Sequence, residues 1–227
     1  IAAAVERCAA VAILTVKSEL SHKCASAAEA AGVALIECVA DAPREGAFRL
    51  PSPPAAPQQH GSSAALNTKE DNVLVLMTTG TTGTPKRVPF RLRRLFDAGR
   101  LNASSLGVTS SDLALCMLPL YHSGAVCCIL FGSLLSGSRA LFLPKLDVAR
   151  FLELLDHAPS WADAPCSWAF AVPTMWQAII SHAEARGGVP PSSQRRLRCV
   201  RNAWAPLPHA DAARLRATLQ CAVLPGY

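Results

Sequence analysis

Apolar residues recur along the first fifty positions with the spacing of two strands and one helix. Residues 11–16 and 33–39 are short, mostly apolar runs, the pattern of buried strands. Residues 18–31 between them predict a helix that ends at Gly32, a residue suited to a helix end. A strand, a helix and a strand in this order predict parallel pairing through a right-handed crossover.

The hydrophobic pattern breaks off after residue 50. Residues 51–70 are rich in proline, serine and glutamine at their start and have no hydrophobic period, which indicates a linker or loop. Residues 73–77 then form a continuous apolar run, which predicts a strand buried on both faces. We therefore expect a strand–helix–strand segment over 1–50, a linker over 51–70 and a larger core segment over 71–227.

Strand-like and helix-like patterns alternate through the larger segment. Strands are predicted at 113–118, 139–143, 168–172 and 197–202. Helices are predicted at 91–105, at 125–135, from Asp147 as the cap to about residue 156, and from Pro173 onward. This alternation predicts an α/β fold in which mostly parallel sheets are flanked by helices.

One uncharged stretch, residues 113–138, is long enough to raise the question of a transmembrane helix. Pro119, Gly124 and several serines interrupt it, however, and these residues are typical of chain breaks within a globular core. We therefore expect a buried strand, a loop and a helix here, and no transmembrane segment.

Composition and charge limit the kinds of molecule that the chain is expected to bind. The chain is 51% hydrophobic and 17% charged, which is enough apolar material for a sizeable core. Its net charge is +6, with arginines gathered in 91–94 and 195–201. Such clusters suit nucleic acid or acidic ligands. No nucleic-acid-binding motif accompanies them, so a nucleic-acid-binding protein is a rival hypothesis supported by charge alone, and we expect no nucleic-acid partner.

The nine cysteines are scattered without any Cys-x-x-Cys spacing. This arrangement suggests neither a zinc site nor a disulfide framework, so a reducing compartment is expected, either the cytoplasm or the lumen of an organelle. The sequence opens at Ile1 without a signal-peptide pattern. We interpret it as an excerpt of a longer protein.

The most distinctive stretch follows the apolar run at 73–77. Residues 78–84 are five threonines and two glycines, and Lys86 comes shortly after. Glycine lets a backbone approach a ligand closely, and successive N–H and hydroxyl groups make a concave donor surface for an anion. A phosphate-binding loop is therefore predicted, with these candidate residues: Thr78, Thr79, Gly80, Thr81, Thr82, Gly83, Thr84 and Lys86. It is not a Walker loop, because its glycines are three apart and Pro85 precedes the lysine.

This stretch resembles the signature loop of the adenylate-forming, or AMP-binding, enzymes, a superfamily that includes the acyl-CoA synthetases. The usual form is Thr-Ser-Gly-Thr-Thr-Gly-x-Pro-Lys-Gly, and residues 78–86 match it with Thr79 in place of serine. Arg87 stands where the family has its last glycine. Residues 118–122, Leu-Pro-Leu-Tyr-His, resemble a second family motif, Leu-Pro-Leu-Phe-His. By this resemblance, His122 lies near the reacting carboxylate and the path of the attacking thiol.

A third motif carries the main departure from the family. Residues 202–207, Asn-Ala-Trp-Ala-Pro-Leu, resemble the family's Ser-Gly-Gly-Ala-Pro-Leu loop, whose small residues let adenine and the acyl chain lie against backbone. Trp204 replaces one of these glycines, and its indole could fill ligand space. By this resemblance the adenine and acyl contacts are Ala203, Trp204, Ala205 and Pro206 of this loop, together with Tyr227. Tyr227 ends a stretch, Leu-Pro-Gly-Tyr at 224–227, that resembles the start of the family's Gly-Tyr-Gly-x-Thr-Glu motif, whose tyrosine stacks on adenine. Trp176, after another family-like segment, could line the acyl pocket or fill the core.

The resemblance implies part of the large N-terminal domain of the acyl-activating enzyme fold. It implies ATP-dependent activation of a carboxylic acid, fatty or aromatic, to an acyl-adenylate, with Mg²⁺, followed by transfer to coenzyme A. Lys86 and His122 are the catalytic candidates, and no metal ligand is assigned. The alternative is a catalytically degenerate nucleotide-binding or interaction module, favoured by Arg87 and Trp204. The family's magnesium-supporting glutamate and its C-terminal domain would follow Tyr227, so we expect residues 1–227 alone not to form acyl-CoA.

Overall fold

The computed structural model describes residues 1–8, 10, 12–16, 21–40, 48–49, 72–78, 86–190 and 192–226. The chain separates into two compact units. The N-terminal unit comprises Ile1–Asn67 with Met77–Arg87, and the C-terminal unit comprises Thr68–Leu76 with Val88–Tyr227. The domain limits predicted at residues 50 and 70 stay predictions.

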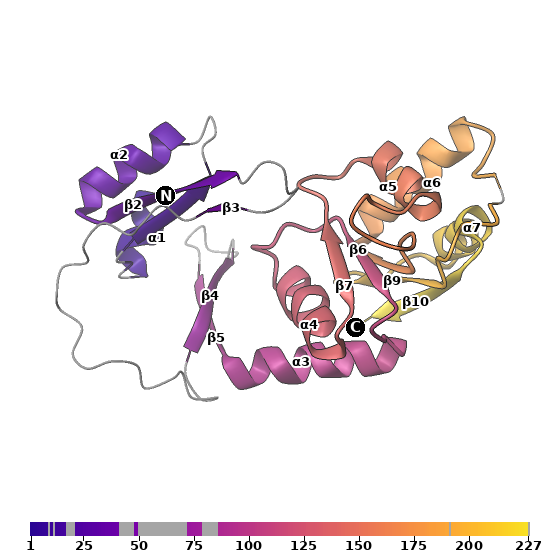
Figure 1. Ribbon diagram of the computed structural model, residues 1–227, viewed down its shortest axis with the longest axis horizontal. Coiled ribbons are helices and arrows are strands. Elements are labelled where there is room, and N and C mark those ends of the chain that lie inside the picture. The colour runs from indigo at the N-terminus through magenta and orange to yellow at the C-terminus, as the bar shows by residue number, and fades with distance from the viewer. Residues whose placement is uncertain are drawn as a thin grey trace. The chain divides into compact units, whose positions relative to one another are not determined.

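The N-terminal unit contains a three-stranded sheet with two helices. Its elements are α1 (Ala2–Arg7), β1 (Ala12–Val16), α2 (Ser21–Ala31), β2 (Ala34–Ala40) and β3 (Phe48–Arg49). Strand β1 pairs with β2 in parallel, with Ala12 opposite Ala34, and α2 contacts both strands (Figure 1). The predicted strand–helix–strand unit is therefore confirmed. Strand β3, which pairs antiparallel to β2, was not predicted.

Strands β4 (Asn72–Thr78) and β5 (Lys86–Arg91) form a two-stranded sheet. The prediction that this apolar run is buried on both faces is wrong, because Val73 and Val75 are 36% and 43% exposed. A continuous apolar run indicates a strand buried on both faces only when the strand lies inside a covered sheet. Within the described residues, β4 has one strand partner, β5.

The C-terminal unit is built on a five-stranded, fully parallel sheet in the order β10-β9-β8-β6-β7. Its strands are β6 (Leu113–Cys116), β7 (Arg139–Phe142), β8 (Trp168–Ala171), β9 (Cys199–Ala203) and β10 (Ala222–Gly226). Its helices are α3 (Leu92–Leu106), the π-helical turn η1 (Ala125–Leu130), α4 (Phe131–Ser136), α5 (Val148–Asp156), α6 (Pro173–Ala185) and α7 (His209–Leu219). The parallel α/β fold is confirmed. Helix α7 and strand β10 were not predicted.

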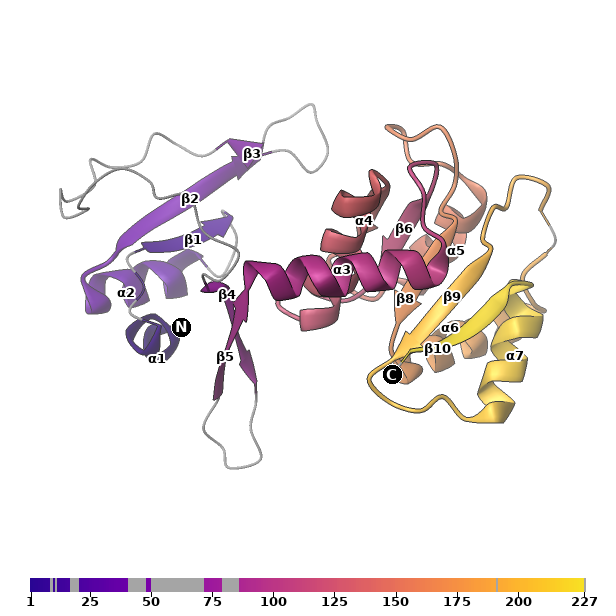
Figure 2. The ribbon, with the colours of Figure 1, turned by 90° about the horizontal axis from the view of Figure 1, so that it is seen from below.

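Both faces of this sheet are covered by helices. Leu113 and Leu115 face a core shared with α5, α6 and α7, whereas Ala114 and Cys116 face a second core shared with α3 and η1. Figures 1 and 2 show α3 and α4 on one side of the sheet and α5–α7 on the other. The uncharged stretch 113–138 therefore forms the expected strand, loop and helix. Among the described helices, none is long and apolar enough to cross a membrane.

Trp176 belongs to the first of these cores. Its side chain is fully buried, and its ring meets that of Phe151 edge-on with 6.1 Å between centroids. Of the two roles left open for Trp176, the structure therefore supports filling the core.

A partly buried ionic cluster links three strands at the amino-terminal edge of the sheet. The Arg198 guanidinium donates to both Asp112 carboxylate oxygens at 3.1 and 3.2 Å, and Ser167 Oγ donates to the same carboxylate at 2.6 Å. Burial by itself raises the pKa of Asp112, but hydrogen bonds from Arg198, Ser167 and Thr109 outweigh it and hold that pKa below its usual 3.8. The cluster joins the residues that immediately precede β6, β8 and β9.

The strand order places a topological switch point between β6 and β8. From β6 the chain moves to β7 on one side, and from β8 it moves to β9 and β10 on the other. Parallel sheets of this order bind ligands at the carboxyl ends of the strands beside such a switch point. The loops after β6, β8 and β9 are therefore where a site is expected.

Candidate functional site

His122 and Trp204 meet at this carboxyl-terminal edge. His122 lies in the loop after β6 and Trp204 directly follows β9, and their rings approach edge-on with 4.7 Å between centroids. The indole also meets Phe170 of β8 edge-on at 5.0 Å. Two motifs about eighty residues apart in the sequence are thus in contact.

The backbone of Trp204 keeps a conformation that suits glycine. Its φ is +65°, in the left-handed region that is costly for bulky residues. Trp204 is 47% exposed, and its indole lies over Gly124, where an added Cβ would overlap the indole carbon Cη2. The Trp204 indole therefore fills space beside His122 and Gly124. A glycine at position 204 would leave this space open.

The hydrogen bonding of His122 indicates which ring nitrogen carries the proton. The backbone N–H of Gly124 donates to Nδ1 of His122 in a long hydrogen bond of 3.4 Å. A neutral imidazole that accepts at Nδ1 carries its proton on Nε2. Half-buried His122 can therefore donate from Nε2 to an oxygen of a bound carboxylate.

Two cavities of about 350 Å³ each flank the end of β9. The first, here called the tryptophan cavity, is lined by Cys128, Phe170, Arg201, Ala203, Trp204 and Gly226. The second, here called the proline cavity, is bounded by Asn202, by the loop 205–207, by α7 and by the end of β10. Arg201 lines the tryptophan cavity and Asn202 lines the proline cavity. Because successive side chains of a strand point to opposite faces, the two cavities lie on opposite faces of the sheet.

The predicted adenine and acyl loop divides between these cavities. Ala203 and Trp204 line the tryptophan cavity, and Ala205 and Pro206 line the proline cavity. Asn202 Nδ2 donates to the Ala205 carbonyl at 2.8 Å, which holds the loop against the strand. Asn202 Oδ1 is buried and, among the described residues, has no hydrogen-bond partner.

The predicted phosphate loop lies between β4 and β5 in the chain. Thr78 ends β4 and Lys86 begins β5, and both residues are exposed. Thr79, Gly80, Thr81, Thr82, Gly83 and Thr84 lie outside the described residues, as does Tyr227. Their roles stay predictions.

Three of the four arginines of 195–201 have defined partners in the fold. Arg195 donates to both oxygens of Asp156 at 2.8 Å, and Arg198 pairs with Asp112 as described. Arg201 Nη1 instead donates to the neutral side chains of Asn102 and Ser105. Much of this charge therefore stabilises the fold and does not form an open basic face.

Sequence reasoning missed Phe170, Arg201 and Asn202 as site residues. Phe170 is an ordinary apolar strand residue, and Arg201 was assigned to a basic cluster. Only their position in the sequence could have identified them, since each lies near the end of a strand that leads into a recognised loop. The strand order, which local patterns do not contain, was needed to use that signal.

The cysteines behave as core residues. All nine are free and seven are buried. Burial raises the pKa of the Cys116 and Cys166 thiols to about 12 each, so these groups stay protonated. Within the described residues, no group of three or more His, Cys, Asp or Glu side chains is arranged to hold a metal ion.

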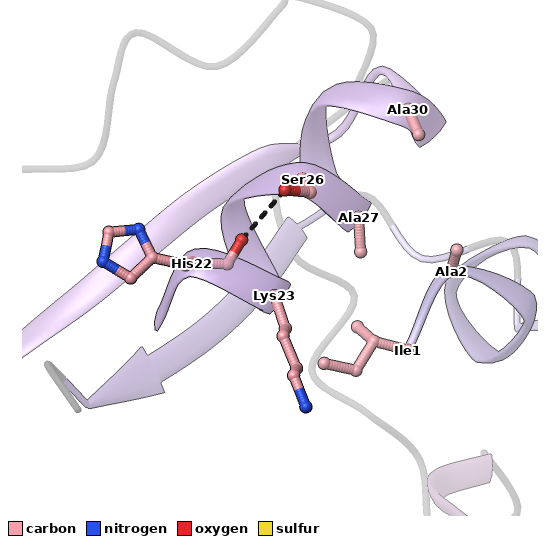
Figure 3. A pocket seen from close by; sticks show the side chains of 7 residues that line it. All are labelled: Ile1, Ala2, His22, Lys23, Ser26, Ala27 and Ala30. Carbon is pink, nitrogen blue, oxygen red and sulfur yellow. Dashed lines mark hydrogen bonds between the residues drawn. The ribbon is translucent and has the colours of Figure 1, made fainter. Parts of the chain in front are cut away.

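A further hollow, of about 500 Å³, lies in the N-terminal unit between the start of α1 and one face of α2 (Figure 3). The hydrogen bond drawn there runs from Ser26 Oγ to the His22 carbonyl within α2, at 3.1 Å. This bond lies within α2 and does not point to a ligand. Among the described residues of the lining, Lys23 has the only charged side chain. We assign the hollow no function.

Comparison with known proteins places this geometry in a family. A family model described as AMP-binding enzyme matches residues 1–227. An acyl-CoA synthetase of Gibberella moniliformis is 31% identical over 121 residues, which are 53% of this chain and 21% of that protein. An oxalate–CoA ligase of Arabidopsis thaliana is 30% identical over 162 residues, 71% of this chain and 30% of that protein. The chain belongs to the AMP-binding enzyme family, whose fold and sequence motifs it carries.

Solved structures share the fold. ATP-bound MatB from Rhodopseudomonas palustris aligns with a TM-score of 0.68 at 19% identity, over 99% of this chain and 41% of that one. The O-succinylbenzoate coenzyme A synthetase of Bacillus subtilis, in complex with ATP and magnesium, aligns with a TM-score of 0.69 at 19% identity, over 98% and 40%. The chain spans 21% and 30% of the lengths of the two curated relatives named above.

Proposed function

We propose that this chain takes part in ATP-dependent activation of a carboxylic acid to an acyl-adenylate and in transfer of the acyl group to coenzyme A. The observation that carries the proposal is the contact between His122 and the loop after β9 at the switch point of the sheet. It unites two motifs of the family to which the chain belongs. The named relatives, both coenzyme A ligases or synthetases, support the same reaction class.

The chemistry has two steps. An oxygen of the carboxylate attacks the α-phosphorus of ATP, and the bond to the departing pyrophosphate breaks. The thiolate of coenzyme A then attacks the acyl carbon, and AMP leaves. Lys86 and the threonine–glycine loop would offset the charge on the departing phosphates. His122 Nε2 would donate to a carboxylate oxygen and hold the acid in line.

The proline cavity suits the adenine of the nucleotide. Its volume of about 350 Å³ lies within the range of small-ligand sites, and its walls are the loop 205–207 and the end of β10. Asn202 lines this cavity and, through its hydrogen bond to the Ala205 carbonyl, would hold the loop 205–207 in place against the base. Mg²⁺ at nucleotide sites is bound largely through phosphate oxygens and water. We assign no metal ligand and route no step through the ion.

The alternative, a catalytically degenerate nucleotide-binding module, is favoured by one observation. The Trp204 indole stands against His122, where the reacting carboxylate would lie. A module of this kind would bind ATP without exchanging pyrophosphate into it.

Acid-dependent exchange of labelled pyrophosphate into ATP, with ATP binding measured by calorimetry on the same samples, tests both functions. Activation predicts exchange with at least one acid of a panel, and a fall of about a hundredfold in Lys86→Ala. Lys145→Ala, an exposed lysine before α5, is the matched control and should leave exchange unchanged. ATP binding without exchange would support the degenerate module, and absence of both would contradict both functions.

A further inference from the structure

We propose that the tryptophan cavity receives a second, negatively charged group of the acid substrate, bound by Arg201. The substrate class is then a short acid with an anionic group at each end, in place of the fatty or aromatic acid that the family resemblance suggested. The inference rests on the proposed function.

The first argument is the uncompensated charge of Arg201. Its Nη1 donates at 2.9 Å to Asn102 Oδ1 and at 2.9 Å to Ser105 Oγ, and both partners are neutral. Arg195 and Arg198, which precede it by a few residues, each bind a carboxylate with two hydrogen bonds. Among the described residues, no carboxylate pairs with Arg201. A guanidinium held in place by neutral partners can still form charge-assisted hydrogen bonds with an incoming anion.

The second argument is where the guanidinium lies. Arg201 lines the tryptophan cavity together with apolar or uncharged residues, and it is the only charged residue in the described lining. A Cβ on Gly226 would come within 2.6 Å of Arg201 Nε, so the glycine at the end of β10 leaves room for this group. Burial raises the pKa of the Cys128 thiol to about 11, and the charge of Arg201 acts in the opposite direction. The charge of Arg201 therefore acts on another residue that lines the same cavity.

The third argument is that Trp204 lies between His122 and the tryptophan cavity. Trp204 touches His122 on one side and lines the tryptophan cavity with Arg201 on the other. An acid whose reacting carboxylate is held by His122 would pass beside the indole and present its other end to Arg201. A volume of about 350 Å³ is near the lower limit of small-ligand sites. A long hydrocarbon chain there would leave the guanidinium desolvated without a counter-charge, which is costly.

Succinate and butyrate are matched probes, because both have four carbons and only succinate carries the second carboxylate. We expect calorimetry to show succinate binding at least tenfold more tightly, the effect of about one charge-assisted hydrogen bond. In Arg201→Gln the preference should disappear, because the amide can still bond to Asn102 and Ser105 but carries no charge. Arg201→Lys should keep part of it. Arg196→Gln, an exposed arginine that precedes the opposite end of β9, should keep all of it.

Equal binding of succinate and butyrate, or an undiminished preference in a folded Arg201→Gln protein, would overturn the inference. Thermal unfolding of each variant establishes that it is folded, and Arg201→Lys serves as the second test if Arg201→Gln is not. ATP binding on the same samples separates the two proposals. Intact ATP binding without a succinate preference contradicts the anion site alone. A succinate preference that depends on Arg201, without ATP binding, supports the anion site and contradicts the proposed function.

Discussion

At the scale of single residues, Trp204 concentrates the features of this site. A left-handed backbone conformation costs a residue with a side chain about 1–2 kcal/mol relative to a right-handed one. The aromatic contacts with His122 and Phe170 and the close approach to Gly124 offset that cost. Backbone strain of this kind is concentrated at functional sites.

Replacing Trp204 with glycine should open the site at little cost in stability. The change removes the backbone strain, and the lost indole is 47% exposed, so we expect the free energy of unfolding to fall by less than the roughly 3–5 kcal/mol of a buried tryptophan. Affinity for a non-hydrolysable acyl-adenylate analogue should rise, as measured by calorimetry. Trp161→Gly, with a comparable exposure of 44%, is the control. Unchanged affinity together with a large loss of stability would show that the indole does not occupy ligand space.

A methyl group at Gly124 should act only through Trp204. The φ of Gly124 is −71°, which alanine adopts freely, whereas its Cβ would overlap the indole. We expect Gly124→Ala to destabilise the protein by about 1–3 kcal/mol, as overpacking does. In the Trp204→Gly background the same change should cost little. A double-mutant cycle in urea measures this coupling, and additive effects would argue against the contact.

At the scale of elements, the fold is stabilised at one edge of the sheet and carries its candidate chemistry at the other. The ionic cluster of Asp112, Ser167 and Arg198 joins three strands at their amino-terminal ends. The His122–Trp204 contact joins two loops at the carboxyl-terminal ends. Substitutions at the two edges should therefore separate stability from ligand binding.

Asp112→Asn should destabilise the protein and alter its response to acid. It leaves Arg198 without its carboxylate, and the loss should be about 3 kcal/mol, the lower end for broken buried pairs, because the Arg198 side chain is 38% exposed. The folded-state pKa of Asp112 lies below its unfolded value, so the stability it contributes is present above about pH 4 and is lost as pH falls through the folded pKa. Urea unfolding at several pH values between 7 and 3 measures both effects.

Two outcomes of that experiment would count against the cluster. One is a variant as stable as the parent at pH 7, and the other is a variant that loses stability with acid as steeply as the parent. Glu184→Gln, which breaks an exposed pair with Arg214, is the control and should change stability little.

Helix α5 offers a separate test of local sequence control. Asp147 accepts a hydrogen bond from the backbone N–H of Arg150 at 2.9 Å, as its predicted capping role requires. Asp147→Ala should cost about 1 kcal/mol of unfolding free energy, and Asp147→Asn much less, because asparagine caps nearly as well. Thermal unfolding compares the variants, and equal losses would point to charge in place of capping.

At the scale of the whole molecule, the predicted phosphate-binding residues come from one contiguous stretch, Thr78–Lys86. The proposed adenine and acyl contacts instead come from several strands of the five-stranded sheet. Binding of a polyphosphate should therefore depend less on the sheet than binding of AMP does.

We expect ATP and pyrophosphate to bind more tightly than AMP, with ATP in the roughly millimolar range, about −4 kcal/mol. Affinity should fall as salt is added, because the ligand is highly charged. Lys86→Ala should weaken ATP binding, and Lys145→Ala should not. Amide shifts of Gly80 and Gly83 in an NMR titration give the measurement. AMP binding as tight as that of ATP, or shifts at neither glycine with any of the three ligands, would contradict a phosphate-binding loop.

The sequence by itself determined the family and most of the elements, although β3, α7 and β10 were not predicted. The strands and helices of 113–203 follow from apolar periodicity and local signals such as the Asp147 cap, which depend on neighbouring residues only. The three motifs could be identified because each is contiguous. The prediction for residues 73–77 failed for the complementary reason, since burial depends on what covers a strand and not on the strand's own composition.

Only the tertiary structure decided which residues share a site and which charges are compensated. The sequence showed Arg195, Arg198 and Arg201 as one basic cluster, yet two of them bind aspartates and the third binds Asn102, 99 residues away, and Ser105. The contact of Trp204 with His122 likewise follows from the strand order, which places β9 and β6 on either side of β8. Such pairings are long-range, because they arise when the sheet assembles and have no local pattern along the chain.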